Sequence, residues 1–145
     1  MVKNKKRLIM KRFLSIFLLM FIVHHVHSHC QIPCGIYDDQ ARINLMKEHV
    51  KTIEKSMSEL LKDQNDNQTV RWVINKENHA DELTEIITYY FMAQRIKPSS
   101  EKYEEKLTLL HQILINSMKA KQQIDLNVIG DLKSQLLKFE DLYFN

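Results

Sequence analysis

Glycine and proline are scarce in this chain of 145 residues, which contains two of each. A fold rich in β-strands needs turn residues at frequent intervals, and these two residue types supply many of them. Their scarcity argues against such a fold and favours a few long helices. The sequence also lacks an internal repeat, a glycine-rich loop that could bind phosphate, and the ligand spacing of a zinc finger.

Cysteine is equally scarce: the chain has two, Cys30 and Cys34, and both lie in the stretch HCQIPCGIYD at residues 29–38. A thiol oxidoreductase is disfavoured, because the spacing is Cys-x-x-x-Cys rather than Cys-x-x-Cys and no βαβ pattern surrounds it. Pro33 fixes φ just before the second cysteine, and Gly35 permits a tight backbone just after it. We therefore expect this segment to curl into a hook around one ion.

Acidic residues are absent from residues 1–28, where six basic residues accompany an apolar run from Phe13 to Val23. The run is shorter than the ~20 residues that span a bilayer comfortably. Val26 and Ser28 resemble the small-residue pattern that precedes a signal cleavage site. We predict that residues 1–28 are a signal peptide or cleaved leader, which meets the membrane only transiently and leaves His29 as the amino terminus. An uncleaved signal anchor is the alternative.

The positive net charge of the chain comes from this leader. The full sequence has 21 basic and 18 acidic residues, a net charge of +3, but without residues 1–28 it has 15 basic residues against the same 18. The mature chain would therefore carry a charge near minus three. We expect no nucleic-acid binding, because the basic excess belongs to the targeting segment.

Apolar residues recur at helical spacing through residues 29–145, which have the length of one domain. A first helix is predicted over about 39–62, a second over about 68–96, a third around 103–118 and a fourth around 129–143. The predicted apolar faces comprise Ile43, Met46, Val50, Ile53, Met57, Leu60, Val73, Ala80, Leu83, Ile87, Tyr90, Tyr103, Leu107, Leu110, Leu114, Met118, Ile129, Leu132, Leu136, Phe139 and Tyr143. Four amphipathic helices with short connections predict an all-α fold, an antiparallel four-helix bundle with the hook at its amino terminus.

Capping residues and a proline mark the predicted helix boundaries. Asp38 or Asp39 can cap the start of the first helix, and Ser99 or Ser100 the start of the third. The segment at 97–100 contains a proline, which ends the second helix.

A freed amino terminus would change the chemistry of the hook. His29 would offer its amine and its imidazole, and Cys30 its backbone nitrogen and its thiolate. The amine and the amide nitrogen close one five-membered chelate ring, the amide nitrogen and the Cys30 sulfur close a second, and Cys34 can complete a plane. Planar coordination by nitrogen and sulfur suits nickel or copper(II), whereas zinc prefers a tetrahedron.

The stretch at residues 29–38 closely resembles the amino-terminal nickel hook, H-C-x-x-P-C-G-x-Y, of nickel-dependent superoxide dismutases. The predicted helical body and its length extend the resemblance across residues 29–145, and the segment at 71–77 and the turn at 97–98 are similar in a less specific way. The resemblance implies an enzyme of antioxidant defence, with its nickel hook at 29–37. Such an enzyme converts superoxide to dioxygen and hydrogen peroxide while nickel cycles between Ni(II) and Ni(III).

The resemblance also implies the ligand set and the assembly. One nickel ion per subunit would be held by the His29 amine, the Cys30 amide nitrogen and the thiolates of Cys30 and Cys34, with the His29 imidazole as an axial ligand in the oxidised state. Two thiolates and a deprotonated amide push electron density onto nickel and stabilise Ni(III), which neutral histidines alone would not do. The implied assembly is a homohexamer of four-helix bundles.

Two further hook residues are expected to act on the substrate. By resemblance, the Tyr37 phenol lies near the open face of the nickel and positions superoxide or water. The alternative is that this tyrosine only pins the hook to a helix. Gln31 stands where many family members have aspartate, so one negative charge is missing near the path of the anion, and we expect function to survive this change.

The His29 imidazole needs a neighbouring side chain that fixes its orientation. The family commonly supplies a carboxylate from the first helix and a basic side chain from the second, and Asn44 and His79 are the nearest candidates here. Neither is the commonest residue type at its position. We expect His49, His79 and His111, which fall on separate predicted helices, to be isolated surface or interhelical residues rather than metal ligands.

A rival interpretation is a small secreted helical interaction protein in which Cys30 and Cys34 form a disulfide, as an oxidising compartment would favour.

The location of the protein can also be predicted from the leader. The leader predicts export or routing to an organelle, with a cytoplasmic enzyme as the alternative, because the family is usually processed and loaded with metal inside the cell.

Overall fold

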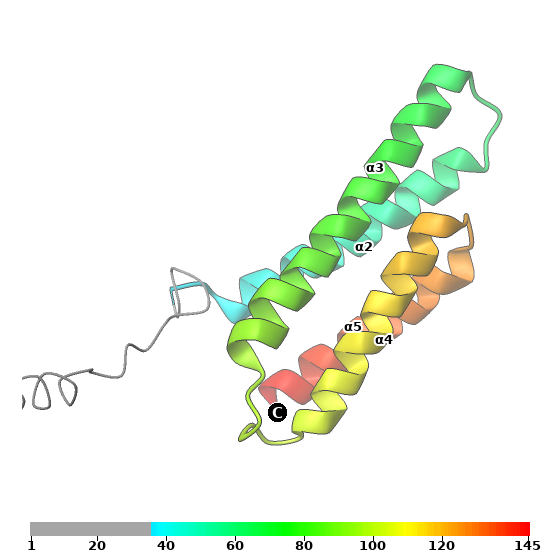
Figure 1. Cartoon of the computed structure of the whole chain (residues 1–145). Coiled ribbons are helices and arrows are strands. Elements are labelled where there is room, and N and C mark those ends of the chain that lie inside the picture. The colour runs from blue at the N-terminus through cyan, green and yellow to red at the C-terminus, as the bar shows by residue number, and fades with distance from the viewer. Residues whose placement is uncertain (1–35) are drawn as a thin grey trace, which may run out of the picture.

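The structure is a computed structural model that describes residues 36–145. Four long helices form its body: α2 (Asp39–Leu60), α3 (Asp66–Glu85), α4 (Tyr103–Gln122) and α5 (Leu126–Phe144). Figure 1 shows two hairpins, α2 with α3 and α4 with α5, and contacts of α2 with α5 and of α3 with α4 join them. The predicted all-α, antiparallel four-helix bundle is confirmed, and the described residues contain no strand.

α3 continues without a break into η1 (Ile86–Arg95), a π-helical segment in which hydrogen bonds join residues five apart. The bond that ends it runs from the Ile96 amide to the Phe91 carbonyl, at 2.9 Å. The two segments together correspond to the predicted second helix, although α3 begins at Asp66. The chain leaves the helix before Pro98, as expected.

The amino terminus of α2 is capped by Asp38, one of the two residues predicted for this role. Its carboxylate accepts hydrogen bonds from the amides of Gln40 and Ala41 at 2.8 and 3.2 Å. These amides belong to the first turn, where the helix itself supplies no acceptor. The cap therefore fixes the point at which the chain leaves the hook and enters the bundle.

The predicted cap of the third helix, Ser99 or Ser100, is wrong. α4 begins at Tyr103, and the residue before it, Lys102, has a φ of 53°, in the left-handed region. Ser100 closes a turn instead: its hydroxyl accepts a hydrogen bond from the Lys97 amide at 3.0 Å, and its amide donates to the Lys97 carbonyl at 2.8 Å. Because this reciprocal pairing uses the polar groups of Ser100, the helix starts three residues later.

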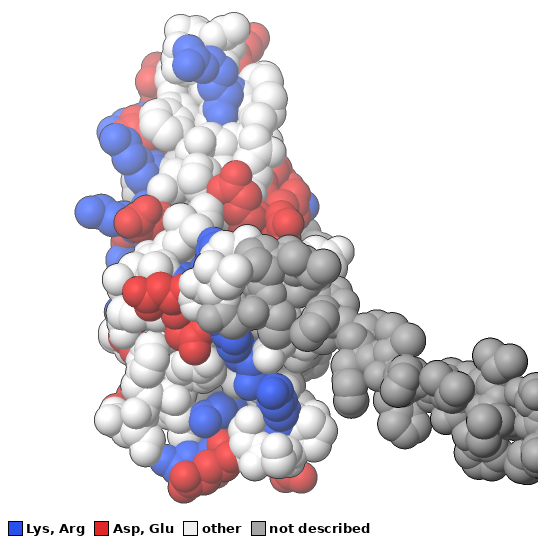
Figure 2. All heavy atoms as spheres, turned by 90° about the vertical axis from the view of Figure 1, so that its left-hand side faces the viewer, with Lys and Arg blue, Asp and Glu red and all other residues white. Residues whose placement is uncertain are grey.

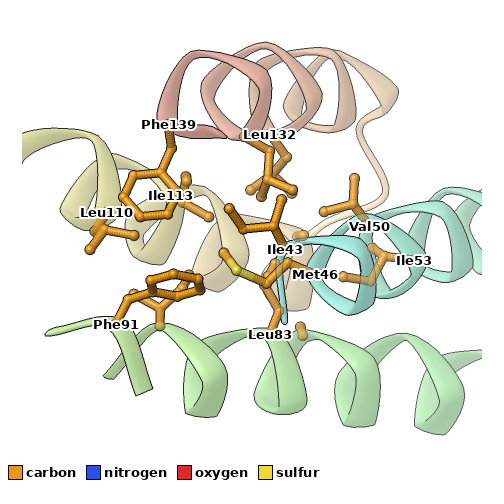
Figure 3. Close-up of a cluster of buried hydrophobic side chains, with 14 of the residues drawn as sticks. Ile43, Met46, Val50, Ile53, Leu83, Phe91, Leu110, Ile113, Leu132 and Phe139 are labelled. Carbon is orange, nitrogen blue, oxygen red and sulfur yellow. The ribbon is translucent and has the colours of Figure 1, made fainter. Parts of the chain in front are cut away.

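One hydrophobic core lies between the four helices, and Figure 3 shows side chains from all of them meeting in it. Its buried members are Ile43, Met46, Val50, Ile53, Met57, Ala80, Leu83, Ile87, Tyr90, Phe91, Ile96, Leu110, Ile113, Ala120, Val128, Ile129, Leu132, Leu136 and Phe139. Most of the predicted apolar positions belong to this core or pack against it. At 38% and 54% exposed, Val73 and Met118 are exceptions.

These two exceptions have separate causes. Val73 lies in the first half of α3, at the end of the α2–α3 hairpin that Figure 1 shows extending beyond α4 and α5. α4 turns its small residues Ser117 and Ala120 toward α3, so Met118 faces outward. The Ser117 hydroxyl donates to the Ala80 carbonyl at 3.0 Å, which holds α3 and α4 close together.

A buried lysine also ties α3 to α4. Lys76, 3% exposed, donates from Nζ to the carbonyl oxygens of Ala120 and Lys121, both at 2.6 Å. These carbonyls lie in the last turn of α4, where the helix leaves them without an amide partner and where its dipole favours a cation.

Among residues 36–145, no helix combines the length and apolar character that a membrane span requires.

Candidate metal centre

Tyr37, the last residue of the predicted hook, is fixed to one end of the bundle through its main chain. Its carbonyl oxygen accepts hydrogen bonds from Tyr90 Oη and Arg95 Nη2, both at 3.2 Å. The Arg42 guanidinium lies 4.3 Å from the centroid of the Tyr37 ring, and the Tyr90 ring meets it edge-on at 6.1 Å. Tyr37 is 41% exposed, and its hydroxyl makes no hydrogen bond to the described residues.

Four side chains converge directly beside this attachment point, and we call them the Asp39 cluster: Asp39, Tyr90, Arg95 and Tyr143. The single hydrogen of the Tyr90 hydroxyl makes a short hydrogen bond to Asp39 Oδ1 and is shared with the Tyr37 carbonyl. Arg95 Nε lies 2.8 Å from the same Asp39 oxygen. Tyr143 Oη donates to Asp39 Oδ2 at 2.8 Å, and Arg95 Nη2 donates to Tyr90 Oη at 2.9 Å. The cluster therefore joins the start of α2 to η1 and to the end of α5.

The charges in this cluster stabilise one another. Burial alone would raise the pKa of the Asp39 carboxyl, but hydrogen bonds from both tyrosines and the positive charge of Arg95 hold that pKa below its usual value. Burial and the hydrogen bond to Asp39 raise the pKa of Tyr90 and of Tyr143. Both phenols therefore remain neutral donors at physiological pH.

The predicted metal ligands His29, Cys30 and Cys34 lie outside the described residues, as do Gln31 and the predicted leader at residues 1–28. The first described residue, Ile36, follows Cys34 by two positions. The predicted coordination is therefore not tested by the structure, which describes the attachment of the hook and the surface next to it.

Two open hollows adjoin Tyr37. One, with a volume of about 480 Å³, is lined by Tyr37, His49, Glu82 and Tyr89 together with neighbouring residues of α2 and η1. The other, of about 560 Å³, is lined by Tyr37, Asn44 and neighbouring residues between Ile36 and Glu48. The tyrosine that the sequence singled out therefore lies between two spaces that can admit small molecules.

The two residues predicted to orient the His29 imidazole lie in different surroundings. Asn44 is exposed on α2, where its side chain accepts a hydrogen bond from Gln40 Nε2 at 3.2 Å. His79 is partly buried on α3, and its Nδ1 lies 2.8 Å from His49 Nδ1. The prediction that His49 and His79 are isolated is wrong, whereas their predicted interhelical position is confirmed.

We call His49, His79 and Glu82 the histidine cluster. Glu82 Oε2 lies 3.2 Å from His49 Nδ1 and 3.4 Å from His79 Nδ1, so three possible ligand atoms form a small triangle. Burial lowers the pKa of His49, and the nearby His79 lowers it further, while the charge of Glu82 partly opposes this. The sequence carries a partial signal, because His79 and Glu82 are three residues apart on one helix and therefore share a face.

Comparisons with known proteins identify the family. A model described as nickel-containing superoxide dismutase matches residues 24–145, which include both cysteines. A crystal structure of a nickel superoxide dismutase mutant is similar in fold, with a TM-score of 0.68 and 18% identity, covering 80% of this chain and 96% of that one. No curated protein matches. The rival interpretation, a small helical interaction protein with a disulfide, gains no support, and this chain belongs to the nickel-containing superoxide dismutase family.

Proposed function

We propose that residues 29–34 hold the nickel ion at which this enzyme disproportionates superoxide. The donors are the His29 amine and imidazole, the Cys30 amide nitrogen and thiolate, and the Cys34 thiolate. Two soft sulfur donors beside nitrogen donors fit nickel, as the family membership requires. When bound, nickel supplies the one-electron oxidation and reduction that convert superoxide to dioxygen and hydrogen peroxide.

One observation carries this proposal: the chain is fixed to the bundle directly after the hook. The Tyr37 carbonyl receives two hydrogen bonds from η1, and the Asp39 cluster holds the next turn of the chain. Tyr37 follows Cys34 by three positions, so their Cα atoms are at most ~11 Å apart. This short tether supports a metal site near the end of the bundle where the two hollows lie.

Tyr37 is the residue that we propose to position the substrate or a water molecule beside the metal. Its main chain already supplies the attachment to the bundle, so the phenol hydroxyl is not needed for pinning. The ring is held between Arg42 and Tyr90, while the hydroxyl has no partner in the described part of the chain. A phenol held in this way can donate a hydrogen bond to an anion without first reorganising.

Gln31 is proposed to keep the approach of the anion free of one negative charge. On the face shown in Figure 2, basic and acidic side chains are interspersed rather than collected into patches of one sign. With both signs present there, we expect groups close to the metal to decide how easily a small anion enters. A neutral residue at position 31 would leave the His29 imidazole and the Tyr37 phenol to interact with the anion.

Processing, assembly and location belong to the same proposal. We propose that cleavage after Ser28 removes the leader and bares the His29 amine, that the enzyme is exported or routed to an organelle, and that it assembles as a homohexamer. The leader composition and the requirement of the hook for a free amine support the cleavage. Mass spectrometry of the native amino terminus and light scattering of the purified protein test the first and last of these points.

Substitution of single hook residues tests the ligand set. Protein beginning at His29 is loaded with nickel, and metal content and superoxide dismutation are measured for Cys30→Ser, Cys34→Ser and the control Ile32→Ala. Both cysteine variants are expected to lose nickel and activity while retaining the helical circular dichroism spectrum. The control changes the same segment without removing a donor and should keep both properties. Nickel retained in either cysteine variant would contradict the assignment.

A further inference from the structure

The histidine cluster has the composition and size of a second metal site. His49 comes from α2, and His79 and Glu82 come from α3, so the cluster lies across a helix pair that shares one hydrophobic core. His49 Nδ1, His79 Nδ1 and Glu82 Oε2 are separated by 2.8, 3.2 and 3.4 Å. None of the three residues belongs to the proposed nickel hook.

These separations are close to the distances between neighbouring ligand atoms around one metal ion. A tetrahedral ion with bonds of ~2.0 to 2.1 Å has neighbouring ligand atoms about 3.3 Å apart. One ion can therefore contact all three atoms with small adjustments of the side chains. Two imidazoles and one carboxylate are also a ligand set that zinc takes in proteins, with a fourth position left for water.

Without a cation, the cluster cannot satisfy all its short contacts. The two Nδ1 atoms are 2.8 Å apart, so one neutral ring must donate to the other. The accepting nitrogen, whose single lone pair takes that hydrogen, then lies close to Glu82 Oε2 with no hydrogen between the two atoms. His49 is 6% exposed and its Nε2 has no hydrogen-bond partner in the described part of the chain. The ring is therefore held through Nδ1 alone, and a cation between the three atoms removes the repulsion.

The access route suits metal binding. Glu82 is more than half exposed, and both His49 and Glu82 line the hollow of about 480 Å³. An ion can enter from that hollow, which also leaves room for a water molecule at the fourth position.

We propose that His49, His79 and Glu82 bind one zinc ion at a site separate from the nickel hook, with the fourth coordination position open to the hollow beside Tyr37. The ion joins α2 to α3 near the end of the bundle to which the hook is attached. Because it binds only the folded chain, it stabilises the fold in proportion to the zinc concentration. The site contains no thiolate and therefore does not duplicate the redox chemistry proposed for the hook.

The test uses the full chain with Cys30→Ser and Cys34→Ser, in which the hook thiolates cannot contribute. Zinc is added, excess metal is removed by gel filtration, and zinc per chain is measured together with the thermal unfolding midpoint. Compared with the same chain carrying Glu82→Gln, we expect about one more zinc ion per chain and a zinc-dependent rise of the midpoint by several degrees. His79→Gln should behave like Glu82→Gln.

Two controls separate this site from other histidines and from misfolding. His111→Gln changes an exposed histidine on α4 and should leave both the zinc count and the midpoint shift intact. Glu82 is exposed, so its replacement tests the site without opening a cavity in the core. Cobalt(II) in place of zinc should give the intense visible bands of a tetrahedral ion, lost in Glu82→Gln.

The proposal fails if the parent and Glu82→Gln chains bind equal amounts of zinc, since the metal then belongs to other groups, such as His24, His25 and His27. It also fails if zinc leaves the unfolding midpoint unchanged, which would mean that a shared proton holds the cluster together. Neither result bears on nickel in the hook, because both parent and variant lack the hook thiolates.

Discussion

The hydroxyl of Tyr143, in the last turn of α5, donates a hydrogen bond of 2.8 Å to the carboxylate of Asp39, the first residue of α2. The bond joins residues 104 positions apart, and it places the carboxyl end of the chain beside the point where the hook enters the bundle. The carboxyl-terminal helix thus supports the segment to which the proposed nickel hook is attached.

Removal of this hydroxyl should weaken the fold. Tyr143→Phe keeps the ring contacts with Phe91 and Phe139 but deletes a donor to a charged acceptor, so we expect a loss of about 1 to 2 kcal/mol in the free energy of unfolding. Urea unfolding followed by circular dichroism measures it. Tyr103→Phe is the matched control, because Tyr103 is partly buried and its hydroxyl has no hydrogen bond within residues 36–145. Equal losses in the two variants would contradict the role of the bond.

Acid should lower the stability of the fold by protonating the Asp39 carboxylate. The pKa of Asp39 lies below its usual 3.8 in the folded chain, so the unfolded chain takes up the proton more readily. Its contribution to stability is therefore complete above pH 3.8 and is lost as the pH falls through the lower, folded-state pKa. Asp39→Asn should be less stable at neutral pH and should lose less further stability in acid.

Urea unfolding between about pH 7 and pH 3 measures this difference. Asp131→Asn is a suitable control, because Asp131 is exposed on α5 and has no hydrogen bond or ion pair among the described residues. The same acid dependence in Asp39→Asn and in the unmodified protein would show that Asp39 is not responsible.

Lys76 offers a test of how α3 is held to α4. Lys76→Met keeps the buried aliphatic stem but removes two charge-assisted hydrogen bonds to the end of α4, and we expect a net loss of about 1 to 2 kcal/mol. The loss is limited because methionine avoids the cost of burying an ammonium group. Lys119→Met, at an exposed position of α4, should change stability by less than about 0.5 kcal/mol. No loss in Lys76→Met would mean that the two effects cancel.

Tyr37→Phe tests the proposed role of the phenol. The ring contacts with Arg42 and Tyr90 remain, so nickel content and thermal stability should be unchanged. If the hydroxyl donates one hydrogen bond to the substrate or to water, its loss should lower kcat/KM about 2- to 10-fold. Tyr89→Phe changes an exposed tyrosine that lines the same hollow and should be neutral. Unchanged activity in Tyr37→Phe would leave the tyrosine a purely structural role.

The bundle itself was predictable from the sequence, because periodicity reports which face of each helix is buried. Ile43, Met46 and Val50 illustrate this, since their spacing placed them correctly in the core. On α4 the predicted apolar face was correct except at Met118, where the small residue Ser117 faces α3 in its place. Hydrophobic pattern alone does not report how closely two helices approach.

Some features of the candidate sites were predictable from the sequence, and others were not. The hook was recognisable because its residues are consecutive, and Asp38 was recognisable as a cap because capping is local. The Asp39 cluster was missed, since its members lie on three helical segments and meet only when the bundle closes. The pairing of His49 with His79 was missed for the same reason: it depends on the rotation of α2 against α3.

Tyr90 and Arg95 are five residues apart in η1, and the π-helical winding turns both toward the Tyr37 carbonyl. In an α-helix, side chains five apart diverge by about 140° around the axis, so a segment of regular pitch would aim only one of these donors at that oxygen. The π-helical segment thus holds the amino-terminal segment through two donors to one carbonyl oxygen. These donors lie 53 and 58 positions further along the chain. A substitution that restored α-helical winding here would weaken the attachment of the proposed nickel hook without changing any proposed ligand.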